Sequence, residues 1–177
     1  FFSDNHIDCV VHTAINGGKR LDKDDISAFF ENILMFQNLA AHSDKFEIMI
    51  NFGSGAEFDR ASTIDALPED ELFNRLPADY YGLVKNLIAR NISDNYENIV
   101  NFRLFGCFGS HEEPQRLINS CYNKLTSGQD AVIHQNKQMD YMFVGDLCRV
   151  LDFYMSSDKF LPRDINLCYE QKITLYD

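Results

Sequence analysis

The sequence has no tryptophan, few prolines and a deficit of basic side chains. Its 16 Lys and Arg stand against 27 Asp and Glu, which gives a formal net charge of −11 at pH 7. A surface that binds nucleic acid needs clustered Lys and Arg, so this balance argues against a nucleic-acid partner. No run approaches the roughly 18 apolar residues that a membrane-spanning helix needs, and no signal-peptide pattern is visible. We therefore expect a cytoplasmic protein that neither binds nucleic acid nor enters a membrane.

Disulfide and metal-binding patterns are also missing. The five cysteines form no C-x-x-C pair, and their odd number fits a complete disulfide framework badly. We expect buried, reduced thiols instead, including Cys107. The five histidines show no ligand spacing, which predicts exposed or hydrogen-bonded imidazoles and no metal site.

Apolar and aromatic residues are plentiful. Hydrophobic residues make up 45% and aromatic residues 13% of the 177 positions, which is enough for the core of one globular domain. The chain opens on Phe1-Phe2-Ser3-Asp4 without a Met and passes almost at once into an apolar run. Both ends resemble interior points of a protein, so we expect further sequence on either side.

Apolar runs and helical spacing alternate along the chain. Strands are predicted at 7–13, 46–52, 99–105 and 131–134, and helices at about 25–43, 77–96 and from about 146 onward. Asp24 or Asp25 can cap the first helix, and Pro77 suits the first turn of the second. This alternation is typical of an open parallel sheet, whose ligands bind beyond the carboxyl ends of the strands. The residues at such ends are Thr13, Ser54 and Phe105.

Tyr81 and Lys85 lie four residues apart, on the same side of the second predicted helix. An ammonium beside a phenol favours the phenolate, so a Tyr with a usual pKa of about 10 can act as a general acid or base near neutral pH. Ser54 could hydrogen-bond the substrate oxygen whose proton moves. The spacing alone is weak evidence, because an amphipathic Tyr followed by a solvated Lys is common and Ser54 could be an ordinary turn residue.

The order of these elements resembles that of the extended short-chain dehydrogenases/reductases, the NAD-dependent epimerase/dehydratase family that modifies nucleotide sugars. The matching segments are, in order, Asp8-Cys-Val-Val-His-Thr-Ala14, Glu31-Asn32-Ile33, the strand ending at Ser54, Tyr81 with Lys85, Arg103-Leu-Phe-Gly-Cys-Phe-Gly109 and Met139-Asp-Tyr-Met-Phe-Val-Gly-Asp146. Such ordered matches are more specific than any one of them. The resemblance implies an α/β fold with a Rossmann-like doubly wound parallel sheet.

Two parts of the family pattern are not matched. The Gly-rich loop that cradles the cofactor pyrophosphate is absent, which implies that the N-terminal Gly-rich half and the C-terminal end of the fold lie outside this chain. Met139 stands where relatives that act on nucleotide sugars usually carry an Arg, and Lys137 or Arg116 could take its place. The resemblance implies one partial domain, with an NAD(P)-binding core at about 1–110 and an interleaved substrate-binding part at about 111–177.

The resemblance also implies roles for single residues. Tyr81 would exchange a proton with a sugar C4 hydroxyl, Lys85 would lower the pKa of Tyr81 and bind the nicotinamide ribose, and Ser54 would polarise the sugar oxygen. The implied cofactor is NAD or NADP, bound by Thr13, Ala14, Asn32, Tyr81, Lys85 and Phe105. The implied substrate is a nucleotide sugar or related sugar, bound by Ser54 and Arg116. A homodimer through a four-helix bundle is also implied, built from the helices around 26–42 and 78–95.

Several alternatives stay open. The chain could belong to a dinucleotide-binding sensor or an inactive relative, although the presence of Ser54, Tyr81 and Lys85 together argues against both. The chain could also be an unrelated α/β binding module in which Y-x-x-x-K occurs by chance. In that case the other matches would be accidental as well. Asn32 could be a surface residue of its helix. The sequence does not distinguish epimerisation, dehydration and reduction, nor NAD from NADP, because the residues that select the cofactor normally follow the second strand of the family's first half.

Overall fold

The computed structural model describes the chain except for residues 1, 3, 19–23, 63, 158–160 and 177. The chain divides into two compact units. The first unit comprises Phe1–Leu104 and Ser157–Asn166, and the second comprises Phe105–Ser156 and Leu167–Asp177. The assignment of NAD(P) binding to about 1–110 and of substrate binding to about 111–177 stays a prediction.

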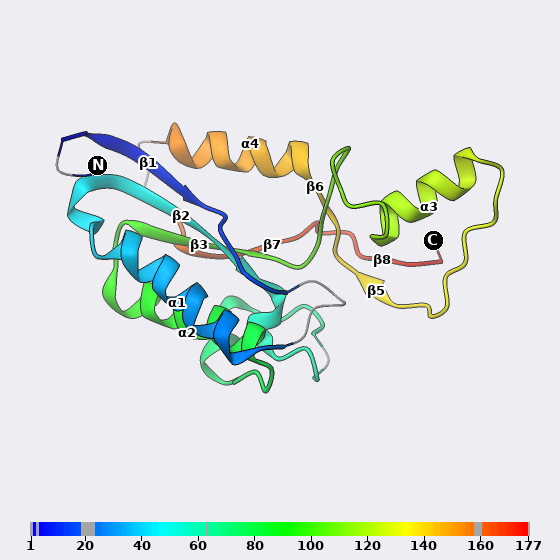
Figure 1. Ribbon diagram of the computed structural model, residues 1–177, viewed down its shortest axis with the longest axis horizontal. Helices are drawn as coiled ribbons and strands as arrows, with labels where there is room; N and C mark the ends of the chain where they lie inside the picture. The colour runs from blue at the N-terminus through cyan, green and yellow to red at the C-terminus, as the bar shows by residue number, and fades with distance from the viewer. Residues whose placement is uncertain (1, 3, 19–23, 63, 158–160, 177) are drawn as a thin grey trace. The chain divides into compact units, whose positions relative to one another are not determined.

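A four-stranded sheet organises the first unit (Figure 1). Its strands are β1 (Ile7–His12), β2 (Phe46–Ser54), β3 (Ile99–Leu104) and β7 (Asp164–Leu167), in the order β1-β2-β3-β7. β1 pairs with β2 and β2 pairs with β3, both in parallel. Parallel neighbours need a crossover connection, and the helices α1 (Ile26–Ala40) and α2 (Tyr80–Asn95) provide these connections. The predicted open parallel sheet is therefore confirmed.

The core of the first unit lies between the sheet and these two helices. α1 packs against α2, and α2 packs against β2 and β3. The buried apolar side chains of this core are Phe36, Ala40, Phe46, Met49, Val84, Ile88, Ile92 and Ile99. Those on the helices recur at intervals of four, as expected for helices that bury one face. Asp25 caps α1 by accepting a hydrogen bond from the Ser27 backbone N–H at 2.8 Å.

Two details of the sequence prediction are wrong. Residues 131–134 form no strand, and Val132 in this segment is exposed. This apolar run is short and pairs with no other strand. Its local preference for β structure is therefore not reinforced by burial against a sheet. Pro77 lies outside α2, which begins at Tyr80 after the cap Asp79.

The second unit combines two helices with short strand pairs. The helices are α3 (Leu117–Thr126) and α4 (Val144–Met155). β4 (Cys107–Phe108) pairs in parallel with β6 (Met142–Phe143), and β5 (Gln138–Met139) pairs antiparallel with β8 (Ile173–Thr174). Lys172 Nζ donates to both carboxylate oxygens of Asp140, at 2.8 and 3.0 Å, close to the β5–β8 pair.

Short 3₁₀ helices complete the first unit. They are η1 (Ser43–Lys45), η2 (Gly55–Phe58) and η3 (Glu69–Phe73). η2 follows β2 directly and contacts α2. The end of the central strand is therefore fixed against the helix that carries Tyr81.

A row of buried polar side chains crosses the sheet. His12, Asn51 and Asn101 occupy paired positions on β1, β2 and β3. His12 Nδ1 hydrogen-bonds Asn51 Oδ1 at 2.9 Å, and Asn51 Nδ2 donates to Asn101 Oδ1 at 2.8 Å. Asn101 Nδ2 then donates to Asp164 Oδ1 on β7 at 3.1 Å and to Glu57 Oε2 at 3.2 Å. Such a row specifies strand register, because a shift by one residue would break every bond in it.

The row ends in a buried ionic cluster of Glu57, Arg103 and Asp164. Arg103 and Glu57 are both 0% exposed, and Arg103 Nε donates to Glu57 Oε2 at 2.7 Å. Arg103 Nη2 donates to both oxygens of Asp164 at 2.9 Å. Burial raises the pKa of Glu57, and the Arg103 guanidinium opposes that shift. Every bond described for the Glu57 oxygens comes from an N–H donor, so the cluster fits the carboxylate form.

We expect Glu57→Gln to lower the free energy of unfolding by about 3 kcal/mol, because it removes one of the two carboxylates that pair with the buried Arg103. The amide that replaces the carboxylate would also point its N–H groups at the N–H donors of neighbouring residues, so that these donors lose an acceptor. Urea denaturation at pH 7 measures the loss. The control Asp44→Asn alters an exposed ion pair with Lys45 and should leave the unfolding midpoint unchanged. Equal losses in the two variants would contradict this account of the cluster.

Candidate active site

Ser54 is held at the carboxyl end of β2 by a capping box. Its hydroxyl accepts a hydrogen bond from the Ala56 backbone N–H at 3.2 Å, and its own N–H donates to Glu57 Oε1 at 2.8 Å. A Cβ on Gly53 would lie 2.3 Å from Glu57 Oε1, so glycine there lets the Glu57 carboxylate approach the strand. The position of Ser54 is therefore fixed through Glu57 by the buried cluster, and its catalytic role stays a prediction.

Tyr81 meets Ser54 from the first turn of α2. The Ser54 hydroxyl lies close enough to the Tyr81 phenol to affect its pKa. Burial raises the pKa of Tyr81, while the Ser54 hydroxyl and the nearby Arg60 guanidinium lower it. The Tyr81 backbone N–H donates to Asp24 Oδ1 at 3.1 Å. Structure and sequence prediction thus agree in bringing the two hydroxyls together at the strand end.

Lys85 lies one turn further along α2 and is buried. Its Nζ donates to the Phe52 carbonyl at 2.6 Å. Burial lowers the pKa of Lys85, and the Glu57 carboxylate opposes this effect. The charged groups that chiefly shift the pKa of Tyr81 are Arg60, Glu57 and Asp79 rather than Lys85. The predicted action of Lys85 on the phenol stays a prediction.

Asn32 anchors the loop that follows β1. Its side chain is buried, accepts from the Asn16 backbone N–H and donates to the Asn16 carbonyl, both at 2.8 Å. The alternative that Asn32 is a surface residue is therefore wrong. Gly18, at φ +84°, brings this loop against Tyr81, since a Cβ there would lie 2.4 Å from Tyr81 Cε2.

A small open pocket of about 40 Å³ lies where this loop, α1 and Tyr81 meet. Its lining residues are Asn16, Gly17, Gly18, Asp24, Asp25, Ala28, Phe29, Asn32, Arg60 and Tyr81. Of the residues predicted for the site, Asn32 and Tyr81 line the pocket. Thr13 and Ala14 are exposed directly after β1.

The other two predicted site residues belong to the second unit. Phe105 is half-buried and directly follows β3. Arg116 is exposed immediately before α3 and pairs with Glu112, with 2.8 Å between Nε and Oε1. Their predicted contacts with cofactor and substrate stay predictions.

The sequence interpretation missed two charged residues at the pocket, Asp24 and Arg60. Asp24 entered only as a possible cap for α1, but its carboxylate binds the first backbone N–H groups of α2, those of Tyr80 and Tyr81. The local sequence does not indicate that Arg60 belongs to the site. Arg60 reaches Tyr81 only because the irregular turn at Asp59 brings the two residues together.

His12 departs from the expectation that buried histidines are fully hydrogen-bonded. It is 7% exposed, and its Nε2 has no hydrogen-bond partner among the residues that the structure describes. Burial lowers the pKa of His12, the bond to Asn51 opposes this, and the Lys85 charge lowers it further. The neutral imidazole is therefore the form that fits the fold.

The cysteines also depart partly from prediction. All five are free thiols, as expected, but none of them is buried. Cys107 is half-buried, and partial burial raises the pKa of its thiol. A raised pKa disfavours the reactive thiolate.

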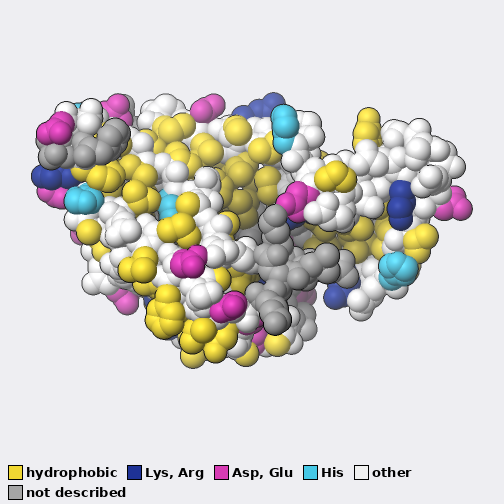
Figure 2. All heavy atoms as spheres, viewed as in Figure 1, with side chains coloured by type: hydrophobic (Ala, Val, Ile, Leu, Met, Phe, Trp, Pro, Cys, Tyr) yellow, Lys and Arg dark blue, Asp and Glu magenta, His cyan; other side chains and the backbone are white. Residues whose placement is uncertain are grey.

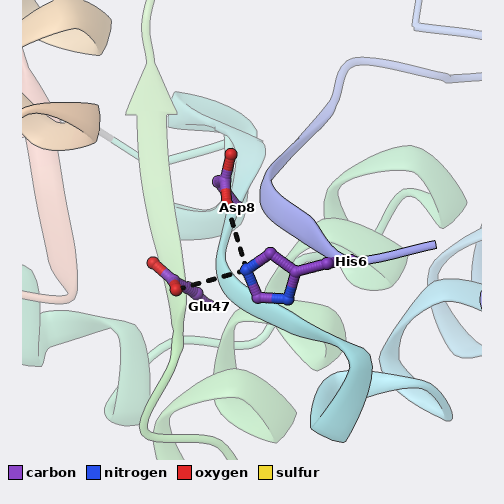
Figure 3. A group of neighbouring side chains, drawn as sticks. All are labelled: His6, Asp8 and Glu47. Atoms are coloured by element: carbon purple, nitrogen blue, oxygen red, sulfur yellow. Dashed lines mark ion pairs between the residues drawn. The ribbon is translucent and has the colours of Figure 1, made fainter.

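One group among the described side chains has the composition of a metal site (Figure 3). His6 Nε2 lies 3.1 Å from Asp8 Oδ1 and 3.4 Å from Glu47 Oε1. All three side chains are exposed, at the opposite end of β1 and β2 from Ser54.

Comparison with known proteins identifies the class that this fold and site define. The model of the NAD dependent epimerase/dehydratase family matches residues 1–168. The chain belongs to this family, as its sequence motifs predicted. No curated protein matches the chain. Separately, no helix in the described part of the chain is long and apolar enough to cross a membrane.

Solved structures share the fold of this chain. UDP-glucuronic acid 4-epimerase from Bacillus cereus is 19% identical with a TM-score of 0.76, over 97% of this chain and 57% of its own. UDP-N-acetylglucosamine 4-epimerase from Methanobrevibacter ruminantium M1 is 19% identical with a TM-score of 0.80, over 96% and 57%. A GDP-L-fucose synthetase from Naegleria fowleri is 15% identical with a TM-score of 0.68, over 92% and 59%. The chain thus spans less than three fifths of these proteins, and the likeness confirms the Rossmann-like fold.

We expect the stability of the protein to fall as the pH drops below about 6.5, in part because of His12. The folded state binds a proton at His12 more weakly than the unfolded chain does, so stability is full above the usual pKa of 6.5 and is lost below it. In His12→Gln, the difference in unfolding free energy between pH 7.5 and 5.5 should be smaller than in the wild type. Urea titrations at both pH values measure it, with the exposed His134→Gln as the control. A difference unchanged in His12→Gln would rule out this role.

Proposed function

We propose that the protein is an NAD(P)-dependent epimerase, dehydratase or reductase that acts on a nucleotide sugar. The observation that carries the proposal is that Ser54 ends the central strand β2 beside Tyr81, with the buried Lys85 one turn further along α2. Family membership supports it. Two of the similar solved proteins are described in complex with UDP-glucuronic acid and NAD, and with NADP. The five free thiols fit a cytoplasmic location.

The pocket fits part of a dinucleotide site. At about 40 Å³ it is far smaller than the roughly 300 Å³ or more of typical cofactor sites, so the described residues supply one wall. Positive φ angles at Gly17 and Gly18, and the anchoring of the loop by Asn32, present backbone to a ligand without side-chain obstruction. The residues that would hold the cofactor are Thr13, Ala14, Asn32, Tyr81, Lys85 and Phe105.

Proton transfer at the sugar is the part of the reaction assigned to this chain. A bound nicotinamide supplies the hydride chemistry. Tyr81 takes the proton of the sugar hydroxyl, or returns it, through its phenol oxygen. Ser54 bonds the same sugar oxygen and orients it toward Tyr81. Lys85 binds the nicotinamide ribose, and Arg116 contacts the substrate.

We expect Tyr81→Phe to retain cofactor binding and to lose at least about 10²-fold in turnover, because the general acid/base is removed while the ring remains. The measurement uses the complete gene product: nicotinamide fluorescence for NAD(H) and NADP(H), and turnover of a panel of nucleotide sugars. Tyr122→Phe, at an exposed tyrosine on α3, is the matched control and should keep wild-type activity. Cofactor binding without turnover in any variant would favour a dinucleotide sensor. A folded protein that binds no dinucleotide would overturn the proposal.

We also propose a homodimer in which α1 and α2 of two copies form a four-helix bundle. Ile26, Phe30 and Leu34 recur every four residues on α1 and are 49%, 57% and 59% exposed. Hydrophobic side chains reach the surface over this part of the molecule (Figure 2). An exposed apolar stripe of this kind is typical of a helix that packs against a partner.

Charge placed in this stripe should separate the dimer. We expect Phe30→Glu and Leu34→Glu to convert a dimer into a monomer, because dimerisation would bury an unpaired carboxylate. Light scattering after size-exclusion chromatography gives the mass. Leu125→Glu, at a leucine 64% exposed on α3, is the control and should leave the dimer intact. A wild-type protein that is monomeric throughout the accessible concentration range would refute the dimer.

A further inference from the structure

A second stripe of residues runs along α2 beside the candidate catalytic pair. Gly82 and Asn86 directly follow Tyr81 and Lys85, and Arg90 continues the same four-residue spacing. Residues spaced in this way share one face of a helix. Asn86 is 0% exposed. Asn has a low helix propensity, and burial of its amide costs free energy unless hydrogen bonds replace those to water. A buried Asn in the interior of α2 therefore depends on partners in a neighbouring segment.

The partners of Asn86 are backbone carbonyls at the ends of two 3₁₀ helices. Its Nδ2 donates to the Glu57 carbonyl in η2 at 2.8 Å. It also approaches the carbonyls of Leu72 and Arg75, at 3.3 and 3.2 Å. An Asn amide has two N–H groups for these three acceptors, so the shortest bond, the one to Glu57, is the main one. Asn86 therefore ties the segment that directly follows β2 to α2.

Arg90 supplies the donors for the other two carbonyls. Its Nη2 donates to the carbonyls of Leu72 and Arg75 at 2.7 and 2.9 Å, which is closer than Asn86 approaches either of them. Its Nε donates to Asn86 Oδ1 at 2.7 Å and so orients the amide. The end of η3 is thus held mainly by Arg90. The Glu57 carbonyl is the contact that depends on Asn86.

Gly82 allows η2 to approach α2 closely. A Cβ at this position would lie 2.8 Å from the Ala56 carbonyl oxygen and 2.8 Å from Pro77 Cβ. The Ala56 N–H in turn donates to the Ser54 hydroxyl at 3.2 Å. η2 is therefore held against α2 at two points one helical turn apart, at Gly82 and at Asn86. These two contacts set the distance between the end of β2 and the first turn of α2.

We propose that Asn86 is a positioning residue that holds Ser54 and Tyr81 in the relative positions required for proton transfer at the sugar oxygen. The inference rests on the proposed function for its catalytic meaning. Asn86 neither gives nor takes a proton. It acts through Glu57, whose carbonyl it binds and whose carboxylate binds the Ser54 N–H. A displacement of about 1 Å at a reacting group can cost about 10²-fold in rate, so the loss of this one hydrogen bond is sufficient to impair catalysis.

The test compares Asn86→Ala with two other variants of α2 in the complete gene product. We expect Asn86→Ala to lower kcat about 10- to 100-fold. Its affinity for NAD(H) or NADP(H), measured by nicotinamide fluorescence, should stay within about twofold of the wild type. Arg90→Met loosens η3 but leaves the bond from Asn86 to Glu57, so it should lower the unfolding midpoint in urea and keep most of its turnover. Asn95→Ala, at an exposed Asn of the same helix, should change neither.

A double substitution separates positioning from a general loss of stability. In a Ser54→Ala background, Asn86→Ala should lower kcat by less than about twofold, because the group that Asn86 positions is already absent. If the two losses multiply instead, Asn86 does not act through Ser54 and the inference is wrong. Equal losses of kcat in Asn86→Ala and Arg90→Met would also overturn it, because loosening of η3 would then explain both.

A spectroscopic measurement needs no turnover. Tyrosine labelled with ¹³C at Cζ gives NMR signals, and Tyr81→Phe identifies that of Tyr81. At neutral pH without substrate, Ser54→Ala should move this signal, and Asn86→Ala should move it in the same direction. Gly82→Ala should do so as well: it keeps the hydrogen bonds of Asn86 and favours the helix, so it serves if Asn86→Ala does not fold.

An unmoved Tyr81 signal in the folded variants would overturn the inference. If the signal moves while Tyr81→Phe keeps full activity, the proposed function fails and the positioning of Ser54 by Asn86 stands.

Discussion

The buried ion pair between Arg103 and Glu57 is the interaction on which the rest of the first unit depends. Neither side chain is exposed to water, so each buried charge depends on its hydrogen-bond partners within the protein. Arg103 joins β3 to Asp164 on β7, while the second oxygen of Glu57 binds the Ser54 N–H. The cluster that connects β3 to β7 therefore also sets the position of the candidate catalytic serine. A substitution that breaks the cluster would disturb both the sheet and the site.

The site sits in a region of mixed charge where burial opposes ionisation. The Tyr81 phenol and the Lys85 ammonium are both disfavoured in their charged forms by burial. Such groups are often found at catalytic sites, because a group whose ionisation is finely balanced responds to small changes in its surroundings. At Tyr81 the balance is set by a hydroxyl on one side and a guanidinium on the other.

Local sequence was sufficient to predict the sheet strands and helices whose pattern is strong. The runs at 7–13, 46–52 and 99–105 form the strands β1, β2 and β3, of which β1 is only partly buried, and Asp25 caps α1 as expected. The short run at 131–134 looked similar but pairs with no sheet. Family resemblance gave the Ser54–Tyr81 pair. It did not give the Glu57 cluster or Arg60, because those contacts join residues 19 to 61 positions apart and depend on the packing of the whole sheet.

The first turn of α2 has a further consequence. Backbone N–H groups at the start of a helix commonly bind phosphates, helped by the positive end of the helix dipole. Here the N–H groups of Tyr80 and Tyr81 are already bound by Asp24, and that of Gly82 by Asp79. In the proposed function, a nucleotide that approaches this helix end would meet two carboxylates instead of free amides. We expect its phosphates to bind away from the start of α2, because these carboxylates would repel them.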